Sequence, residues 1–108
     1  MSTEITRAVL DHHMQSLNNA DLDATMADYA EDCVYISGET ILRGPDALRG
    51  PFGAVPAGAV DQMAMQHSVC EGDVAYIVWS MANGMKGTDT FIVRDGKIVV
   101  QTVCLVMP

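Results

Sequence analysis

Apolar and polar positions follow a helical period in the first part of this chain and a strand period in the second. From Thr3 to about Asn18, apolar side chains recur every four residues, as along one face of an amphipathic helix. The row comprises Ile5, Val9, His13 and Leu17. His13 therefore lies inside the apolar row, whereas His12 lies about 100° around the helix, nearer its flank.

A second, shorter helix is predicted from Asp21 to Tyr29 or Ala30. Its apolar stripe is formed by Leu22, Met26 and Tyr29. Asp21 suits the N-cap, because its carboxylate can accept hydrogen bonds from the free amides of the first turn and meets the positive end of the helix dipole. A polar break at Glu31-Asp32 then leads into an extended segment.

The extended segment is predicted as a strand over Cys33–Ser37, and the turn Gly38–Thr40 connects it to Ile41–Arg43 in a small hairpin. A short helix then begins at Gly44-Pro45-Asp46, with its proline near the first helical position, and ends at Gly50-Pro51. The Gly-, Pro- and Ala-rich connection Phe52–Gly58 is expected to be the most mobile segment.

Strands dominate the remainder of the chain. Asp95-Gly96 is the strongest hairpin signal, because Asp-Gly pairs fit the tight turns that connect antiparallel strands. The predicted strands are Asp61–Val69, Val74–Ala82, Thr88–Arg94 and Ile98–Met107. Helices followed by a four-stranded antiparallel meander predict an α+β domain, with the helices on one face of a curved sheet.

Composition limits the classes of function. The 108 residues suffice for one domain, residues 1–108, with a single core. Residues are 49% apolar and 19% charged, and no apolar run approaches the roughly 18 residues that span a bilayer. The first ten residues lack the features of a signal peptide. The chain is therefore expected to be cytoplasmic, with no membrane partner.

The formal charge of −8 argues against nucleic-acid binding, which needs clustered basic side chains. Three widely spaced cysteines, an odd number, suggest reduced thiols packed as small core residues, although a catalytic cysteine stays an alternative.

A metal site is the next alternative, formed by the histidines and nearby acids. The histidines are His12, His13 and His67. Adjacent helical histidines diverge, and no spacing resembles a zinc motif, so no metal is expected. No nucleotide-binding motif or hydrolase triad is recognisable, and we expect no cofactor.

The first half of the chain resembles the nuclear transport factor 2-like (NTF2-like) superfamily, which includes ketosteroid isomerases and SnoaL-type polyketide cyclases. The matching pattern is a helix, an Asn-x-x-Asp-Leu-Asp step, an aromatic-Ala-acid-Asp step, a first strand and a glycine that opens the next helix. Here the matching positions are Asn18, Asp21–Asp23, Tyr29–Asp32, Cys33–Ser37 and Gly44. The resemblance implies a cone-shaped fold of the cystatin-like type and a largely apolar pocket.

The resemblance also implies a site. Asp89 matches the acid that lines the ketosteroid isomerase pocket, where an apolar environment keeps it protonated. His13 falls where that enzyme has its oxyanion-hole tyrosine, and Ser37 where it has its aspartate base. A hydroxyl without an adjacent base cannot shuttle a proton between carbons, so steroid isomerase activity by that mechanism is not expected.

What remains is the pair Asp89 and His13, which suits enolisation of a carbonyl substrate: one group moves the proton and the other holds the oxyanion. Two non-catalytic interpretations stay open. His13 can be a buried helix histidine hydrogen-bonded to backbone, and Asp89 can be a strand-end acid that faces solvent. Strand alternation and the resemblance add candidate ligand-binding residues: Tyr35, Ser37, Ile77, Trp79, Met81, Phe91, Gln101 and Val103.

The leading hypothesis is a dimeric SnoaL-like protein that binds a small apolar carbonyl compound and catalyses isomerisation or aldol-type cyclisation without a cofactor. The alternative is a non-catalytic dimeric binder or scaffold of the same fold, and a hydrolase or dehydratase in the same pocket is a third possibility. The methionines, notably Met63, Met65, Met81 and Met85, fit either a ligand surface or a homodimer interface on the outer sheet face.

Overall fold

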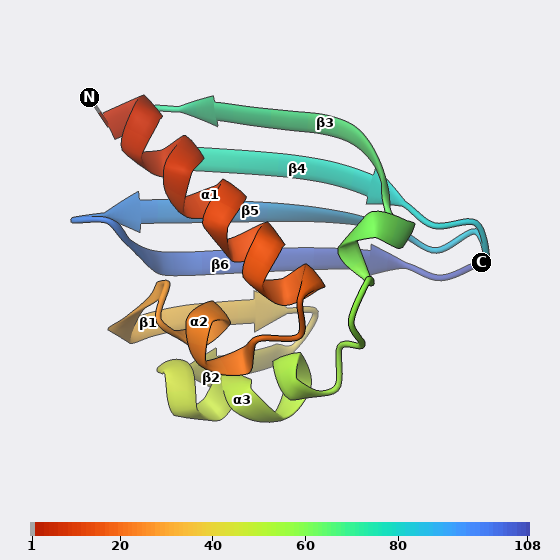
Figure 1. Cartoon of the computed structure of the whole chain (residues 1–108), viewed down its shortest axis with the longest axis horizontal. Coiled ribbons are helices and arrows are strands. Elements are labelled where there is room, and N and C mark those ends of the chain that lie inside the picture. The colour runs from red at the N-terminus through yellow and green to blue at the C-terminus, as the bar shows by residue number, and fades with distance from the viewer. Residues whose placement is uncertain (1) are drawn as a thin grey trace.

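Helices lie against one face of a six-stranded sheet in the computed structural model, which describes residues 2–108 (Figure 1). Met1, the first residue of the predicted domain, lies outside the described residues. The helical segments are α1 (Ser2–Asn18), α2 (Leu22–Met26), α3 (Pro45–Gly53) and the short 3-10 helix η1 (Val60–Gln62). The strands are β1 (Tyr29–Ser37), β2 (Thr40–Arg43), β3 (Ala64–Glu71), β4 (Val74–Ser80), β5 (Lys86–Arg94) and β6 (Lys97–Val106).

The strand order is β2-β1-β6-β5-β4-β3. The predicted α+β fold and the meander β3-β4-β5-β6 are confirmed. The sheet is mixed and not wholly antiparallel as predicted, because β1 runs parallel to β6. This pair becomes parallel because α3 and the segment after it carry the chain across to the far edge, where β3 begins (Figure 1).

Helix α1 crosses the sheet diagonally (Figure 1), and its beginning is tied to the β3–β4 turn. Thr6 donates a hydrogen bond to the Gly72 carbonyl over 2.7 Å, and the Gly72 amide donates to Thr3 over 2.8 Å. The predicted apolar row was wrong at one end, since Ile5 is 49% exposed. A spacing of four residues drifts by about 40° per step, so it cannot follow one face over four turns. The face that packs on the sheet is Thr6, Leu10, His13 and Ser16.

The second helix is shorter than predicted. Asp21 is the N-cap as expected, and its side chain accepts a hydrogen bond from the Ala24 amide. The helix ends at Met26, however, and Tyr29 is the first residue of β1. Tyr29 was therefore assigned to the wrong element, because its spacing from Met26 fits a helical stripe as well as a strand start.

Helix α3 passes through the proline that was predicted to end it. It extends to Gly53 and includes Pro51. Gly50, which precedes Pro51, has no Cβ to collide with the proline ring, and this relieves the usual conflict. The extension changes the role of Phe52: it was predicted in a mobile connection, and it lies in α3, half-buried and packed against the core.

Strand β3 differs most from its predicted pattern. Val60–Gln62 is a 3-10 helix, so the strand begins only at Ala64. A register shift between Met65 and His67 breaks the predicted alternation of Met63, Met65, His67 and Val69 on one face. One extra residue at a bulge reverses which side chains point to each face. Apart from the half-buried Cys70, the strand is exposed throughout, as befits a sheet edge.

Strands β4 and β5 have the predicted alternation, which creates an inner face beneath α1. Strand β6 departs from it at a register shift, so that Ile98 and Gln101 are both buried. The tight turn predicted at Asp95-Gly96 is confirmed, with φ values of 51° and 74°. Pairing across the sheet aligns one inner row as Ser68, Ile77, Asp89, Val103 and Ser37, and the next as Cys70, Ala75, Phe91, Gln101 and Tyr35. Directly opposed residues share a face, so the predicted ligand-binding residues from β1, β4, β5 and β6 gather on the inner face.

Within residues 2–108, no helix combines the length and the apolar character needed to cross a membrane. The cysteines are all free. Cys33 is buried in the core as predicted, Cys70 is half-buried against it, and Cys104 is exposed, which is not the predicted core position. Cys104 is exposed because β6 places it on the face away from the helices, opposite Thr88.

Candidate functional site

Asp89 is a carboxylate on the inner face of β5, and its side chain accepts two hydrogen bonds. Trp79 Nε1 donates to its Oδ1 over 3.0 Å, and Gln101 Nε2 donates to its Oδ2 over 3.0 Å. Asp89 is 9% exposed, so it is not the solvent-facing strand-end acid of the alternative interpretation. Burial raises the pKa of Asp89, and the hydrogen bonds from Trp79 and Gln101 only partly offset this.

The next contact leads from β6 to β1. Tyr29 donates its hydroxyl proton to Oε1 of Gln101 over 2.5 Å. Both side chains are at least 95% buried. Burial raises the pKa of Tyr29 well above its ordinary value, helped by the negative charge that Cys33, Tyr35 and Asp89 can carry. Tyr29 is therefore a hydroxyl throughout the physiological range.

His13 is fully buried, and its partners are side chains, not the backbone groups of the alternative interpretation. Its Nε2 lies 3.1 Å from the Tyr29 hydroxyl and its Nδ1 lies 3.2 Å from Oδ2 of Asp28. Aromatic rings enclose it edge-on, with ring centroids 5.0 Å away for Tyr29, 6.0 Å for Phe91 and 6.1 Å for Phe52.

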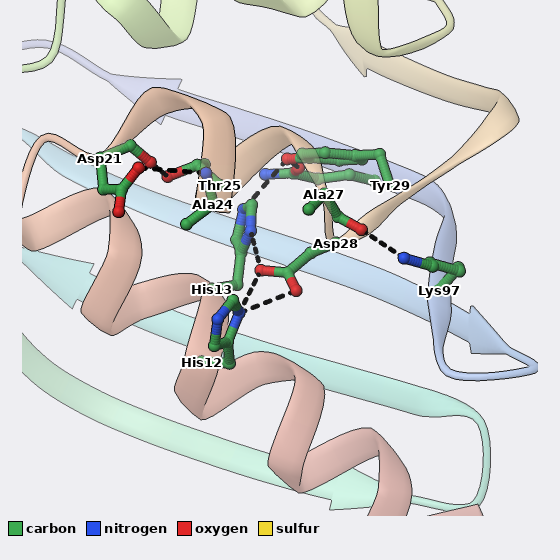
Figure 2. Close-up of polar contacts among 10 residues, drawn as sticks. His12, His13, Asp21, Ala24, Thr25, Ala27, Asp28, Tyr29 and Lys97 are labelled. Carbon is green, nitrogen blue, oxygen red and sulfur yellow. Dashed lines mark hydrogen bonds and ion pairs between the residues drawn. The ribbon is translucent and has the colours of Figure 1, made fainter.

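The Asp28 carboxylate is hydrogen-bonded to two histidines, as Figure 2 shows. Besides its contact with His13, its carboxylate lies 2.8 and 2.9 Å from Nδ1 of His12. The His12 side chain is 55% exposed and that of Asp28 is 12% exposed, so this end of the arrangement reaches solvent. Burial raises the pKa of Asp28, but the hydrogen bonds and charges of His13 and His12 outweigh it and leave the pKa below its ordinary value.

These contacts form one continuous chain of hydrogen bonds from the protein surface to the inner face, which we call the buried relay. Its members in order are His12, Asp28, His13, Tyr29, Gln101, Asp89 and Trp79. The two predicted catalytic residues are thus in the same network. Gln101 and Tyr29 connect Asp89 to His13. Among residues 2–108, no hydrogen bond joins Asp89 to His13 directly.

The predicted ligand-binding residues surround this network. Ile77 and Phe91 are buried beside Asp89 on the inner face, together with Trp79 and Gln101. Tyr35, Ser37, Met81 and Val103 are only half-buried. Ser37 lies in the same row as Asp89, separated from it by Val103. All of them except Met81, which follows the end of β4, share the inner face, while the role of the whole set in binding stays a prediction.

Two hollows reach members of the buried relay. One of about 740 Å³ lies among α2, β1 and α3 and includes Tyr29 in its wall. Another of about 580 Å³ includes Trp79 and Gly87, and its remaining wall is formed by Gln66, Val78, Ser80, Lys86, Thr88, Cys104 and Val106. Neither hollow contains Asp89 or His13, whose surroundings are filled by side chains.

The methionines are not where a dimer interface on the outer face would need them. Met63, Met81 and Met85 pack against the core, and Met65 is opposite Trp79 in the β3–β4 pair. The apolar residues of the outer face are mainly valines and isoleucines, with one tyrosine, Tyr76. Among residues 2–108, no three metal-ligating side chains gather closely enough to hold a metal ion.

Sequence reasoning missed three residues of the site: Asp28, Tyr29 and Phe52. Tyr29 gave little signal, because the exposed Glu31 and a register shift after Tyr29 interrupt the alternation that Cys33 and Tyr35 follow. Asp28 gave no signal, because its contact with both histidines depends on how α1 lies over the α2–β1 junction. Phe52 was hidden by the assumption that Gly50-Pro51 ends the helix.

The family model of the SnoaL-like domain matches residues 10–101 of this chain. No curated protein matches the sequence. Solved structures share the fold. An NTF2-like protein of unknown function from Burkholderia xenovorans has a TM-score of 0.83 and 20% identity, covering 100% of this chain and 88% of its own.

Two further structures have names that state an activity. A putative ketosteroid isomerase from Kribbella flavida has a TM-score of 0.81 and 19% identity, covering 100% of this chain and 82% of its own. An epoxide hydrolase of the LEH-like type from M. tuberculosis has a TM-score of 0.76 and 15% identity, covering 98% of this chain and 86% of its own. At these identities the similarity establishes the NTF2-like fold that the sequence predicted.

Proposed function

The chain belongs to the SnoaL-like domain family, and we propose that it binds a small apolar carbonyl compound and catalyses cofactor-free proton transfer on it at Asp89. The observation that carries this proposal is the environment of one carboxyl group. Asp89 is buried on the inner face, and both of its hydrogen-bond donors, Trp79 and Gln101, are neutral. Buried carboxyl groups with a raised pKa are typical of catalytic acids and bases.

The chemistry follows from the raised pKa of Asp89. As a carboxylate, Asp89 takes a proton from the carbon beside the substrate carbonyl: the C–H bond breaks, an O–H bond forms, and the electron pair moves into an enolate. The resulting carboxylic acid returns the proton to another carbon, or the enolate attacks a second carbonyl in a cyclisation. A pKa nearer neutrality makes both directions accessible to one group.

His13 supports this chemistry from a distance. It is fully buried and separated from Asp89 by Tyr29 and Gln101, so we assign it the role of a positioning residue. The indole N–H of Trp79 donates to Asp89, and because it is a single proton it can hold a substrate oxygen only in place of that carboxylate. Trp79 also borders the hollow of about 580 Å³, but the wall of that hollow includes Val78, Thr88 and Cys104, which belong to the outer face. A small compound must therefore reach Asp89 from the inner face.

Proton abstraction can be measured without knowing the natural substrate. The protein is incubated in D₂O with small β-keto esters, cyclic enones and aryl ketones, and exchange of the α-proton is followed by NMR. We expect enzyme-dependent exchange with at least one compound class. Asp89→Asn, which keeps the shape but not the basicity, should lower the exchange rate at least about a hundredfold.

The matched control is Asp32→Asn, the same substitution at an exposed position of β1. It should leave exchange unchanged. Equal exchange by Asp89→Asn and the unmodified protein would overturn the assignment of Asp89. No exchange with any compound, together with no ligand-induced rise in Tm across the same panel, would favour the non-catalytic alternative.

A second candidate, the dimeric binder or scaffold, is favoured by the outer sheet face. One row there runs across all six strands without a charge: Val69, Tyr76, Thr90, Thr102, Ile36 and Ile41. Val69 is 52% exposed and Ile41 is 56% exposed. In a chain of net charge −8, an uncharged row is where a second copy can approach with least repulsion. We expect a homodimer through this face, in either functional case.

A cytoplasmic setting is part of the same proposal. It is supported by the free state of Cys33, Cys70 and Cys104, since thiols persist in reducing compartments.

A further inference from the structure

The hydrogen bonds in the middle of the buried relay all run in one donor-to-acceptor direction, because each group can donate only the protons that it carries. Tyr29 has one hydroxyl proton and donates it to Gln101 Oε1. Its oxygen must then accept from His13, so Nε2 of His13 is a donor. Asp28, a carboxylate whose pKa is lowered, accepts from Nδ1 of His13. In this arrangement His13 is an imidazolium and Asp89 is a carboxylate.

The same atoms also support the reverse direction. A half-turn of the Gln101 amide places Oε1 against Asp89 and Nε2 against Tyr29, since the amide is nearly symmetric in shape. Asp89 must then carry a proton to donate to Oε1. Tyr29, which accepts from Gln101, turns its hydroxyl toward His13, whose Nε2 becomes an acceptor. Asp28 still accepts the hydrogen bond from Nδ1 of His13.

The two arrangements contain the same number of protons. In the first, the mobile proton is on Nε2 of His13, and the pair carries one positive and one negative charge. In the second, the N–H bond of His13 is broken, an O–H bond exists on Asp89, and both groups are neutral. Every buried polar side-chain atom of the described residues has a partner in the first arrangement, and each atom of the relay keeps one in the second.

We propose that Asp89 and His13 share a single acidic proton, and that Gln101 and Tyr29 are positioning residues that couple the two sites by reversing their hydrogen bonds together. The relay therefore supplies Asp89 with a proton, or withdraws it, without opening the inner face to water. The catalytic role of this shared proton rests on the proposed function, but the sharing of the proton between Asp89 and His13 needs no substrate.

The surroundings leave few other groups to interfere. Besides the relay members, the titratable groups that act on these sites are Tyr35, whose raised pKa reflects both burial and the charge of Asp89, and Cys33, which acts on Tyr29. The neighbours of Asp89 in its row, Ile77 and Val103, are apolar. The chief charges facing the relay are thus those of its own members at the solvent end, Asp28 and His12.

The coupling is tested by NMR titration of the intact protein without ligand, with ¹³C-labelled aspartate carboxyl groups and ¹⁵N-labelled histidine rings. Two sites that share a proton titrate as a pair, so each nucleus reports both steps of the titration. We expect the Asp89 carboxyl carbon and the His13 Nε2 to show the same two midpoints. One separate midpoint for each nucleus in the unmodified protein would overturn the proposal.

Two variants interrupt the path at different atoms. Tyr29→Phe removes only a hydroxyl and keeps the ring that packs against His13 and Phe52, and Gln101→Leu removes the amide. In both, the shared midpoints should separate into one for each nucleus. The matched control is Tyr35→Phe, which removes a hydroxyl from the same strand outside the relay and should keep the shared midpoints.

This experiment separates the coupling from catalysis. Shared midpoints that are lost in Tyr29→Phe support the coupling even if no carbonyl compound undergoes exchange. Shared midpoints that persist in both Tyr29→Phe and Gln101→Leu would overturn the assigned path. Catalytic exchange that depends on Asp89, combined with independent midpoints, would keep the proposed function and remove this inference.

Discussion

The two faces of the sheet are built from alternate residues of the same strands, yet one buries polar side chains and the other exposes apolar ones. The inner face lies under α1 and contains buried polar side chains, each with a hydrogen-bond partner. The outer face leaves several apolar residues exposed: Val69, Val74, Tyr76, Val106 and Ile41. The polar groups of the inner face find their hydrogen-bond partners within the chain, whereas apolar residues of the outer face stay exposed.

The difference shows where specificity lies in this fold. A buried polar network is stable only when all members are paired, so removal of one partner leaves another buried and unsatisfied. An exposed apolar face tolerates exchange of its side chains but favours association. Substitutions on the inner face should therefore change folding and proton chemistry, whereas substitutions on the outer face should change assembly.

The largest effect is expected at Gly87, the inner-face neighbour of Trp79. A Cβ at this position would overlap the indole and lie 2.5 Å from its Cε2. Gly87→Val should lower the free energy of unfolding by about 2 to 3 kcal/mol, as overpacking does elsewhere, and should pull Trp79 away from Asp89. Chemical denaturation measures the first effect, and the fluorescence of Trp79, the single tryptophan, measures the second.

The matched control for Gly87→Val is Thr88→Val, one residue further on and on the outer face opposite Val78. It should change the free energy of unfolding by less than about 0.5 kcal/mol. Equal losses in the two variants would show that the inner and outer faces do not differ as proposed.

A smaller effect on folding but a clear one on assembly is expected at Tyr76, which is 41% exposed on the outer face. Tyr76→Glu places like charges against each other in a symmetric dimer and should weaken association at least about tenfold, which corresponds to about 1.4 kcal/mol. Sedimentation velocity measures the dissociation constant. The control Gln62→Glu adds the same charge in η1 and should leave association unchanged.

A monomeric unmodified protein over the whole concentration range would contradict the dimer. If it is dimeric and Tyr76→Glu leaves the dissociation constant unchanged, the interface lies on another face.

The smallest effect sharpens the comparison within the inner face, between the solvent end and the buried end of the relay. The folded-state pKa of Asp28 is lowered, so its contribution to stability is present above its ordinary pKa of 3.8 and is lost as the pH falls through the lower folded value. The pKa of Asp89 is raised, so its protonation stabilises the folded state as the pH falls toward 3.8.

The two substitutions should therefore change the acid response in opposite directions and in different pH windows. Below about pH 4, Asp28→Asn should lose less stability than the unmodified protein. As the pH falls from neutrality toward about 4, Asp89→Asn should lack the stabilisation that protonation of Asp89 gives to the unmodified protein. Denaturation curves between about pH 3 and pH 7 test this. The same slope in both variants would mean that the two ends of the relay do not differ electrostatically.

The sequence predicted much of the fold because periodicity is a local property. Strand alternation placed Asp89 on the same face of β5 as Phe91 and Val93, and Asp95-Gly96 marked the hairpin that aligns β5 with β6. The boundaries at Tyr29, Pro51 and Met63 were wrong because short segments fit two periods, or because a local helix breaker was tolerated beside a glycine.

The candidate site was only partly accessible to this reasoning. Asp89 and His13 could be chosen by residue type, position and family resemblance, and the structure places both in one network. Their separation could not be foreseen, because it depends on Gln101 and Tyr29 filling the space between β5 and α1. Strand pairing brings Gln101 beside Phe91, and the bond to Tyr29 spans 72 positions in sequence.

By itself, the sequence determined the order of elements, the strand face that Asp89 shares with Phe91 and Val93, and an excess of negative charge, since each depends on neighbouring residues or on composition. Only the tertiary structure decided that the sheet is mixed, that the inner face is filled, and that Asp28 connects two histidines to the core. These features depend on which distant side chains meet when α1 settles on the sheet. Hydrogen-bond direction and burial then follow from contacts that no local pattern encodes.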